Sequence, residues 1–145
     1  MTITYSKFNK SLNKFFLYEN KPHIAVGVSG GPDSIALVFI LSKWIKQNKG
    51  KLIALIVNHQ IRKDSYLESL ETKKFLDCNN INNRILTVSR KKVLKGQMNQ
   101  ARDNRLNIII NFCKKNKIFH LFLGHHFDDN VETFLLRKIA GSNLE

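Results

Sequence analysis

The sequence predicts an α/β protein in which helices cover both faces of a parallel sheet. Short apolar runs alternate with longer amphipathic stretches, which is the pattern of repeated strand–helix–strand units. The apolar runs have few polar interruptions, as expected for strands buried on both faces. The chain has 145 residues, of which 43% are hydrophobic, so we expect a single domain over residues 1–145 with a substantial core.

The first three expected elements are a helix, a strand and a second helix. Ser6–Glu19 is expected to be helical because its apolar residues recur at helical spacing, namely Phe8, Leu12, Phe15 and Phe16. Pro22 ends this segment, and the apolar run His23–Val28 is expected to form the first strand. Asp33–Gln47 is the next expected helix, and the turn Asn48-Lys49-Gly50 ends it.

The rest of the chain continues this alternation. Lys51–Asn58 is expected to be a second buried strand. Ser65–Cys78 is expected to be a helix with inward-facing apolar residues, namely Leu67, Leu70, Phe75 and Leu76. The remaining expected elements are strands at Asn82–Val88 and Phe119–Leu123, a basic loop at Ser89–Gly96, and helices at about Asn99–Lys115 and Asp129–Ile139.

The chain is strongly basic. It has 24 lysines and arginines against 11 aspartates and glutamates, which gives a formal net charge of +13. Such a surplus is typical of proteins with a polyanionic partner, such as RNA or a polyphosphate. The chain is also rich in Lys, Asn and Ile together, as an AT-rich coding sequence would make it. Composition alone therefore leaves nucleic-acid binding and coding bias as equal explanations.

The sequence pattern argues against several classes of protein. No apolar run approaches the roughly 20 residues of a membrane helix, and the N-terminus has no apolar stretch of the signal-peptide type. We therefore expect a soluble, cytoplasmic protein without a membrane partner. Cys78 and Cys113 lie far apart in the chain and match no spacing for a disulfide framework or a zinc site.

The loop after the first expected strand is the first candidate site, because parallel α/β sheets bind ligands beyond the carboxyl ends of their strands. Its residues are Ser29-Gly30-Gly31-Pro32-Asp33-Ser34. The glycines allow a tight turn and close approach to an anion, and the proline suits the first turn of a helix, whose free N–H groups attract anions.

The serine hydroxyls of this loop can donate to phosphate oxygens. Asp33 beside a phosphate would hold Mg²⁺ or accept backbone N–H groups. The loop matches neither the Walker A nor the GxGxxG pattern.

Four segments resemble, in the expected order, one enzyme family. The first loop resembles the SGGxDS pyrophosphate loop of the N-type ATP pyrophosphatases, or PP-loop superfamily. Val57-Asn58-His59-Gln60-Ile61-Arg62 resembles the VDHxxR stretch of the tRNA(Ile)-lysidine synthetases within that superfamily. Ala101–Arg105 resembles their ARxxR helix, and Gly124–Thr133 resembles their GHHxDDxxET segment. The resemblance runs from about His23 to Ser142, nearly the whole chain.

The resemblance implies an adenine nucleotide alpha hydrolase-like, Rossmann-like fold that uses ATP and Mg²⁺. The implied ATP-binding residues are Ser29, Gly30, Gly31, Pro32, Asp33, Ser34, Val57 and His59, and Asp33 is also the implied metal ligand. The implied catalytic residues are Asp33, Arg102, His125, Asp129 and Glu132. Arg102 and His125 would contact the phosphate or the adenylate. Asp129 and Glu132 are three residues apart on one helical face and would grip lysine.

The implied reaction joins free lysine to the wobble cytidine of the isoleucine tRNA that has a CAU anticodon. The C2 oxygen of the cytidine attacks the α-phosphate of ATP, and pyrophosphate leaves. The lysine amine then attacks C2, and AMP leaves. Family members normally continue into C-terminal parts that help to grip tRNA, so we expect this chain, which stops at Glu145, to be the catalytic domain without them. The resemblance also allows a homodimer.

Three positions depart from the family pattern, and two other interpretations stay open. Asn58 stands in place of an aspartate, Leu106 of an aromatic residue and Ala140 of an arginine. The first alternative is a tRNA thiolase of the same superfamily, but cytidine thiolases usually carry CxxC pairs, which Cys78 and Cys113 do not form. The second alternative is a basic RNA-binding fragment without catalytic activity.

The basic loop after the third expected strand is the best candidate for contact with the tRNA backbone. Replacing Lys91, Lys92 and Lys95 together with glutamine should weaken tRNA binding and flatten its salt dependence. The logarithmic salt slope should fall by about 2 to 3, because each phosphate contact contributes about 0.7 to 0.9. Filter binding at several salt concentrations measures this slope, and an unchanged slope would mean that the loop is only solvated.

Overall fold

A computed structural model describes residues 4–58, 60, 64–88 and 98–124, without the side chains of residues 98–103. The elements of this part are α1 (Tyr5–Phe15), β1 (His23–Val28), α2 (Pro32–Gln47), β2 (Lys51–Asn58), α3 (Ser65–Cys78), β3 (Asn83–Thr87), α5 (Met98–Lys115) and β4 (His120–Leu123). Within these ranges, no helix combines the length and the apolar character needed to cross a membrane.

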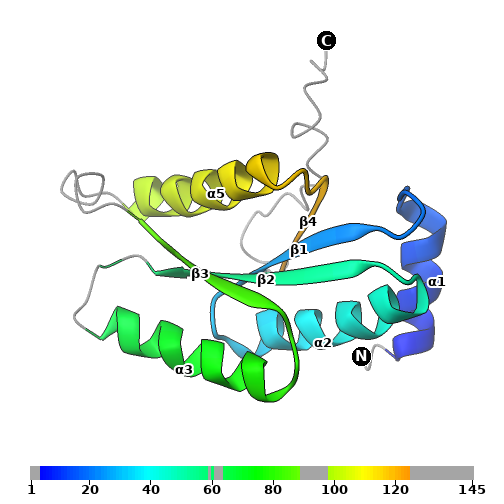
Figure 1. The fold of residues 1–145 in the computed structure, drawn as a ribbon, viewed down its shortest axis with the longest axis horizontal. Coiled ribbons are helices and arrows are strands. Elements are labelled where there is room, and N and C mark those ends of the chain that lie inside the picture. The colour runs from blue at the N-terminus through cyan, green and yellow to red at the C-terminus, as the bar shows by residue number, and fades with distance from the viewer. Residues whose placement is uncertain (1–3, 59, 61–63, 89–97, 125–145) are drawn as a thin grey trace, which may run out of the picture.

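The described strands form one parallel sheet in the order β3-β2-β1-β4 (Figure 1). β1 lies inside the sheet, paired with β2 on one side and with β4 on the other. α1, α2 and α3 cover one face of the sheet, and α5 covers the other (Figure 1). The predicted fold class, a parallel sheet with helices on both faces, is therefore confirmed.

Most element boundaries agree with the sequence-based expectations. β1, β2 and α3 have the expected bounds, and α2 begins one residue early because Pro32 occupies its first turn. β3 lacks one residue at each expected end, and β4 begins at His120. The expected helix Asp129–Ile139 lies outside the described residues.

α1 is shorter than expected, because it ends at Phe15 instead of Glu19. Phe16 takes an extended conformation, with φ −108° and ψ 118°, and turns its ring into the core, where it is 6% exposed. Its ring packs edge-on against Trp44 and Phe122. Phe15, which the helical spacing placed on the apolar face, is instead 73% exposed, and the extended Phe16 packs beside Phe8 and Leu12 in the core.

The predicted inward face of α3 is wrong at two of its four residues. Leu76 is fully buried and Leu70 is half-buried, but Leu67 is 57% exposed and Phe75 is 49% exposed. α3 packs against β2 and the edge strand β3, and its buried stripe is narrow. Phe75 packs instead on Phe39 of α2, with ring centroids 6.1 Å apart.

The core consists of two layers, because successive residues of a strand point to opposite faces. Ile24, Val26 and Val28 of β1 face the side covered by α1, α2 and α3. Ala25 of β1 and Leu55 of β2 face α5. The sheet is thus buried on both faces, which explains why its strands read as continuous apolar runs.

Three asparagines end three helices in the same way, at the turns that lead into β2, β3 and β4. They are Asn48, Asn79 and Asn116, and the side-chain amide of each donates to the carbonyl four residues earlier at 2.8 to 2.9 Å. The next residue takes a left-handed φ of 53° to 56°, and these residues are Lys49, Asn80 and Lys117. Each amide–carbonyl bond contributes about 1 kcal/mol. Part of the asparagine content that composition assigns to coding bias therefore ends helices.

Glu19 joins the amino ends of β1 and β4. Its Oε1 accepts the backbone N–H of His23 at 3.0 Å, and its Oε2 contacts Nε2 of His120. The His120 ring packs edge-on against Phe16, with centroids 4.8 Å apart. Partial burial acts to raise the pKa of Glu19, but the bonds from His120 and His23 outweigh it and hold this pKa below its ordinary value of 4.5.

The Glu19 contact predicts a pH-dependent contribution to stability. Because its pKa is lower in the folded chain than in the unfolded chain, this contribution is present above about pH 4.5 and is lost as pH falls through the folded pKa. The free energy of unfolding of the wild-type chain should therefore exceed that of Glu19→Gln near neutral pH. The difference should shrink as pH falls from about 6 to about 3. Urea denaturation across this range measures the difference, and a constant difference would contradict the assignment.

Candidate phosphate-binding site

The candidate site lies where the order of the strands reverses. The chain passes from β1 through α2 to β2 on one side, whereas β4 joins the other side of β1 after α5 has crossed the opposite face (Figure 1). In open parallel sheets such a reversal separates the loops beyond the carboxyl ends and leaves a crevice for ligands. Two segments meet here: the loop Ser29–Ser34 after β1, and Gly124 after β4.

The hydroxyl of Ser34 holds the loop in shape. Ser34 is 2% exposed, and its Oγ donates to the carbonyl of Gly31 at 2.9 Å while accepting the backbone N–H of Ser29 at 3.2 Å. The Oγ atoms of Ser29 and Ser34 also lie 3.2 Å apart. The motif predicts that the hydroxyls of both serines donate to phosphate oxygens. The structure shows that Ser34 already serves the loop, whereas Ser29 is exposed.

The two glycines of the loop differ in whether their positions could accept a side chain. Gly30 has a φ of +84°, and a Cβ on it would lie 2.9 Å from Oγ1 of Thr72 in α3. Gly31 is the N-cap of α2 with φ −73° and ψ 159°, a conformation open to any residue. A Cβ on Gly31 would meet Oγ of Ser29 at 3.5 Å, an ordinary contact. Gly30 is therefore needed for the turn itself, and Gly31 leaves open surface at the start of α2.

Thr72 was not predicted as part of the site. It lies in the second half of α3, and its hydroxyl donates to the carbonyl of Glu68 at 3.0 Å. Only the packing of α3 beside the loop after β1 brings it to Gly30. The helical phase of Ser65–Cys78 carries no signal for that contact.

The end of β4 lies directly against the first turn of α2. A Cβ on Gly124 would be 3.1 Å from Cα of Ser34 and 3.4 Å from the carbonyl carbon of Asp33. Gly124 is the first residue of the GHHxDDxxET segment, so this segment starts beside α2, the helix that follows β1 and the loop Ser29–Ser34. His125, Asp129 and Glu132 themselves lie outside the described residues.

The amino end of α2 has the electrostatics of an anion site. The helix has 16 residues, with Pro32 in its first position and unsatisfied N–H groups in its first turn. Aligned peptide dipoles give such an end a partial positive charge, which favours phosphate oxygens beside the half-buried Gly31. Asp33 lies in the same turn, and its side chain is exposed.

The exposed carboxylate of Asp33, in the first turn of α2, is an oxygen ligand compatible with Mg²⁺ bound together with phosphate. No group of three or more His, Cys, Asp or Glu side chains gathers among the described residues, and Asp33 is the carboxylate that the loop Ser29–Ser34 offers to an ion. Mg²⁺ usually binds nucleotides in this way, with one or two carboxylates and several waters.

The end of β2 carries two more of the predicted residues. Asn58 is 3% exposed, and its Oδ1 accepts the backbone N–H of Gln60 at 3.1 Å, which closes the turn after the strand. An aspartate would offer the same acceptor, so the departure from the VDH pattern keeps this bond. The side chain of Val57 is 9% exposed and packs in the layer under α5, which leaves its backbone for any nucleotide contact. His59 lies outside the described residues.

α5 carries the ARxxR segment. Arg102 lies in its first half, at a position where the side chain is not described, and Arg105 is half-buried one turn later. Leu106, which replaces an aromatic residue of the family pattern, packs against the core layer under α5. The apolar character of this position is thus kept. Ala140 lies outside the described residues.

Comparison with known proteins identifies related sequences along almost the whole chain. The model of the PP-loop domain family matches residues 4–145. A tRNA(Ile)-lysidine synthase of Wolbachia sp. subsp. Brugia malayi (strain TRS) is 37% identical over 150 residues, covering 97% of this chain and 32% of that protein. One from Orientia tsutsugamushi (strain Boryong) is 33% identical over 139 residues, covering 94% of this chain and 31% of that protein. The chain thus spans about a third of the length of these relatives.

Solved structures show the same fold. The U34-tRNA thiolase NcsA from Methanococcus maripaludis, solved with its 4Fe-4S cluster, has a TM-score of 0.71 and 23% identity, covering 95% of this chain and 51% of that one. The NMN synthetase from Francisella tularensis has a TM-score of 0.56 and 11% identity, covering 86% of this chain and 56% of that one. At these identities the likeness concerns the fold, and it confirms the expected adenine nucleotide alpha hydrolase-like, Rossmann-like architecture.

The two loop glycines provide a matched pair of substitutions. Gly30→Ala should lower the free energy of unfolding by about 1 to 2 kcal/mol, because a left-handed φ is costly for alanine. Gly31→Ala should leave that free energy nearly unchanged and weaken ATP binding by about tenfold or more, because its methyl group would occupy the surface that phosphate approaches. Denaturant titration and isothermal calorimetry measure the two quantities. Unchanged ATP binding in a folded Gly31→Ala chain would show that phosphate does not bind at this surface.

Proposed function

This chain belongs to the PP-loop domain family, and on that premise we propose that it is the ATP-binding catalytic part of a tRNA(Ile)-lysidine synthetase. The observation that carries the proposal is the contact between Gly124 and the first turn of α2, because it brings the start of the GHHxDDxxET segment to the phosphate loop. The relatives named tRNA(Ile)-lysidine synthase match along 94% to 97% of this chain, so both segments fall within the matched region.

In the proposed reaction, the C2 oxygen of the wobble cytidine of isoleucine tRNA attacks the α-phosphate of ATP. The bond between the α-phosphorus and the bridging oxygen breaks, and pyrophosphate leaves. The amine of free lysine, in its neutral form, then attacks C2 and expels AMP. Lysine thereby joins the base through a new C–N bond, and the amine loses one proton. The site, the lysine and the tRNA would all be cytoplasmic.

The described residues would bind and hold the leaving pyrophosphate. The N–H groups at the start of α2 and the exposed Ser29 hydroxyl would donate to its oxygens, while Ser34 keeps the loop in place. Mg²⁺ held by Asp33 would supply positive charge to the phosphates. Preorganised donors of this kind stabilise charge that grows in the transition state, and losing one typically costs about 10²- to 10³-fold in rate.

The other roles rest on residues whose side chains are not described. Arg102 would contact the α-phosphate or the adenylate, since a guanidinium forms paired bonds with phosphate oxygens. His125 would lie beside the same group. Asp129 and Glu132 would hold the lysine and accept its proton. The homodimer stays a prediction.

A tRNA thiolase is the second candidate, favoured by the fold that the chain shares with NcsA. The two cysteines of the chain argue against it. Cys78 is exposed in α3, and Cys113 is buried in α5 on the opposite face of the sheet, where burial raises the pKa of its thiol to about 11. They cannot share one metal cluster. A buried thiol with a raised pKa is also a poor nucleophile at neutral pH.

Incubating the chain with ATP, Mg²⁺, labelled lysine and unmodified isoleucine tRNA tests the proposal. Label should appear in the tRNA, and Asp33→Ala should reduce its rate by about 100-fold or more. Glu71→Ala, which removes an exposed carboxylate of α3, should react like the wild-type chain.

The same assay separates the alternatives. Absence of label, with pyrophosphate release when a sulfur donor and another tRNA are supplied, would point to the thiolase. Retained RNA binding without any ATP turnover would support the RNA-binding fragment. A rate of labelling that Asp33→Ala leaves unchanged would show that Asp33 has no role in the reaction.

A further inference from the structure

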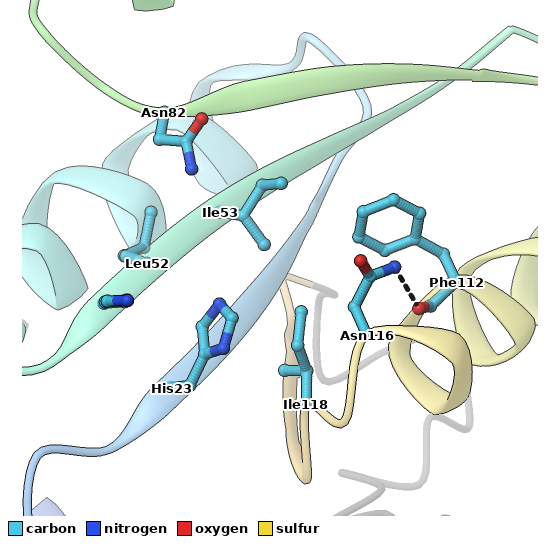
Figure 2. A pocket seen from close by; sticks show the side chains of 8 residues that line it. His23, Leu52, Ile53, Asn82, Phe112, Asn116 and Ile118 are labelled. Carbon is cyan, nitrogen blue, oxygen red and sulfur yellow. Dashed lines mark hydrogen bonds between the residues drawn. The ribbon is translucent and has the colours of Figure 1, made fainter.

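A hollow lined by polar and apolar side chains lies at the end of the sheet opposite to the loop Ser29–Ser34. It has a volume of about 350 Å³ and opens between the amino ends of β1 and β2 and the last turns of α5 (Figure 2). Figure 2 shows the side chains of His23, Asn82 and Asn116 around this space, with Ile53 and Ile118 between them. β1 has six residues, so at roughly 3.3 Å per residue the two edges are about 20 Å apart.

The lining of the hollow favours an anion. None of its residues is an aspartate or a glutamate, and four of them carry nitrogen groups that can donate hydrogen bonds: His23, Lys51, Asn82 and Asn116. Burial and the nearby charge of Lys51 lower the pKa of His23. The negative charge of Glu19 acts in the opposite direction on the pKa of His23. This carboxylate is already bonded to His120 and to the His23 backbone.

Exposed lysines extend the positive charge beyond the hollow. Lys114, Lys115 and Lys117 flank Asn116 at the end of α5 and are exposed, as is Lys51. No carboxylate of the described residues pairs with any of these four, whereas Lys73 pairs with Asp77 at 3.2 Å. We call the hollow together with these four lysines the amino-edge groove.

The ordinary roles of lysine do not explain this arrangement fully. Basic residues near the end of a helix interact favourably with its dipole, which accounts for Lys114 and Lys115. It does not account for Lys51, which lies on a strand. Charge is therefore gathered here from two parts of the fold, the amino end of β2 and the end of α5.

We propose that the amino-edge groove binds the sugar–phosphate backbone of RNA. One phosphate would sit in the hollow among the His23, Lys51 and Asn116 nitrogens, and neighbouring phosphates would lie along the lysines at the end of α5. Exposed lysines at the end of α5, next in sequence to Asn116 of the hollow, extend the positive charge beyond it, and such an extended charge suits a polymer better than a single phosphate ion. The identification of this RNA as tRNA rests on the proposed function, and RNA bound here would contact the domain at the edge opposite the reaction.

Two variants with equal charge loss test the groove. The groove variant is Lys51→Gln, Lys115→Gln and Lys117→Gln. The control is Lys7→Gln, Lys10→Gln and Lys74→Gln, which removes three exposed lysines from helices on the other face of the sheet. Filter binding of unfractionated tRNA at several salt concentrations, without ATP, gives the affinity and the salt slope. Circular dichroism shows that both variants are folded.

The groove variant should bind RNA about tenfold or more weakly at low salt, with a logarithmic salt slope smaller by about 2 to 3. The control should lose less than half as much slope. Equal losses in the two variants, or no measurable RNA binding by the wild-type chain, would overturn the proposal. A chain that binds RNA through the groove but transfers no lysine would refute the proposed function and leave this inference standing.

A local readout separates a phosphate contact from a general charge effect. The imidazole of His23 should show a raised pKa when RNA is bound, because a phosphate beside it stabilises its protonated form. Proton NMR of the histidine ring signals measures this titration with and without RNA. An unchanged His23 titration in the complex would place the RNA elsewhere.

Discussion

The candidate site depends on the close approach of β4 to β1 and to the first turn of α2. Two glycines permit it. A Cβ on Gly27 would lie 2.6 Å from the Leu123 side chain and 3.4 Å from Ile109 of α5, and a Cβ on Gly124 would lie 3.1 Å from Ser34. Because β1 has no side chain at Gly27, β4 and α5 pack tightly against the middle of the sheet. This packing brings the phosphate loop and the start of the GHHxDDxxET segment to one edge, although about 90 residues separate them.

Within that frame, the loop is rigid where it faces the protein and open where it faces a ligand. Ser34 is buried and bonds twice to the loop backbone, so the turn is in place before any nucleotide arrives. The first N–H groups of α2 are left for the anion, whereas the N–H of Gly31 donates to Oγ of Ser29 at 3.4 Å. A transfer of a nucleotide group needs mainly positioning and charge stabilisation, and a preformed loop provides both without reorganisation.

The net charge of +13 has several physical origins, which composition cannot separate. Lys73 pairs with Asp77, and Lys43 lies over the Tyr5 ring, 4.2 Å from its centroid, so these lysines contribute to packing. The lysines of the amino-edge groove have no such partners among the described residues. Asparagine content divides in the same way, since Asn48, Asn79 and Asn116 end helices. Residues of one type therefore have different roles at different positions, and the overall composition does not distinguish these roles.

Local sequence patterns predict the order and bounds of most elements, the parallel sheet, and the glycine-containing turn between β1 and α2. These follow from local rules: apolar runs, helical periodicity, and the steric properties of glycine and proline. Tertiary structure alone decided that Phe15 and Phe75 are exposed, that Ser34 serves the loop and that Thr72 lies against Gly30. Only the folded chain gathers Lys51 and the end of α5 around one hollow. The reason is that contacts between distant segments depend on how helices pack across the sheet, and periodicity carries no information about that packing.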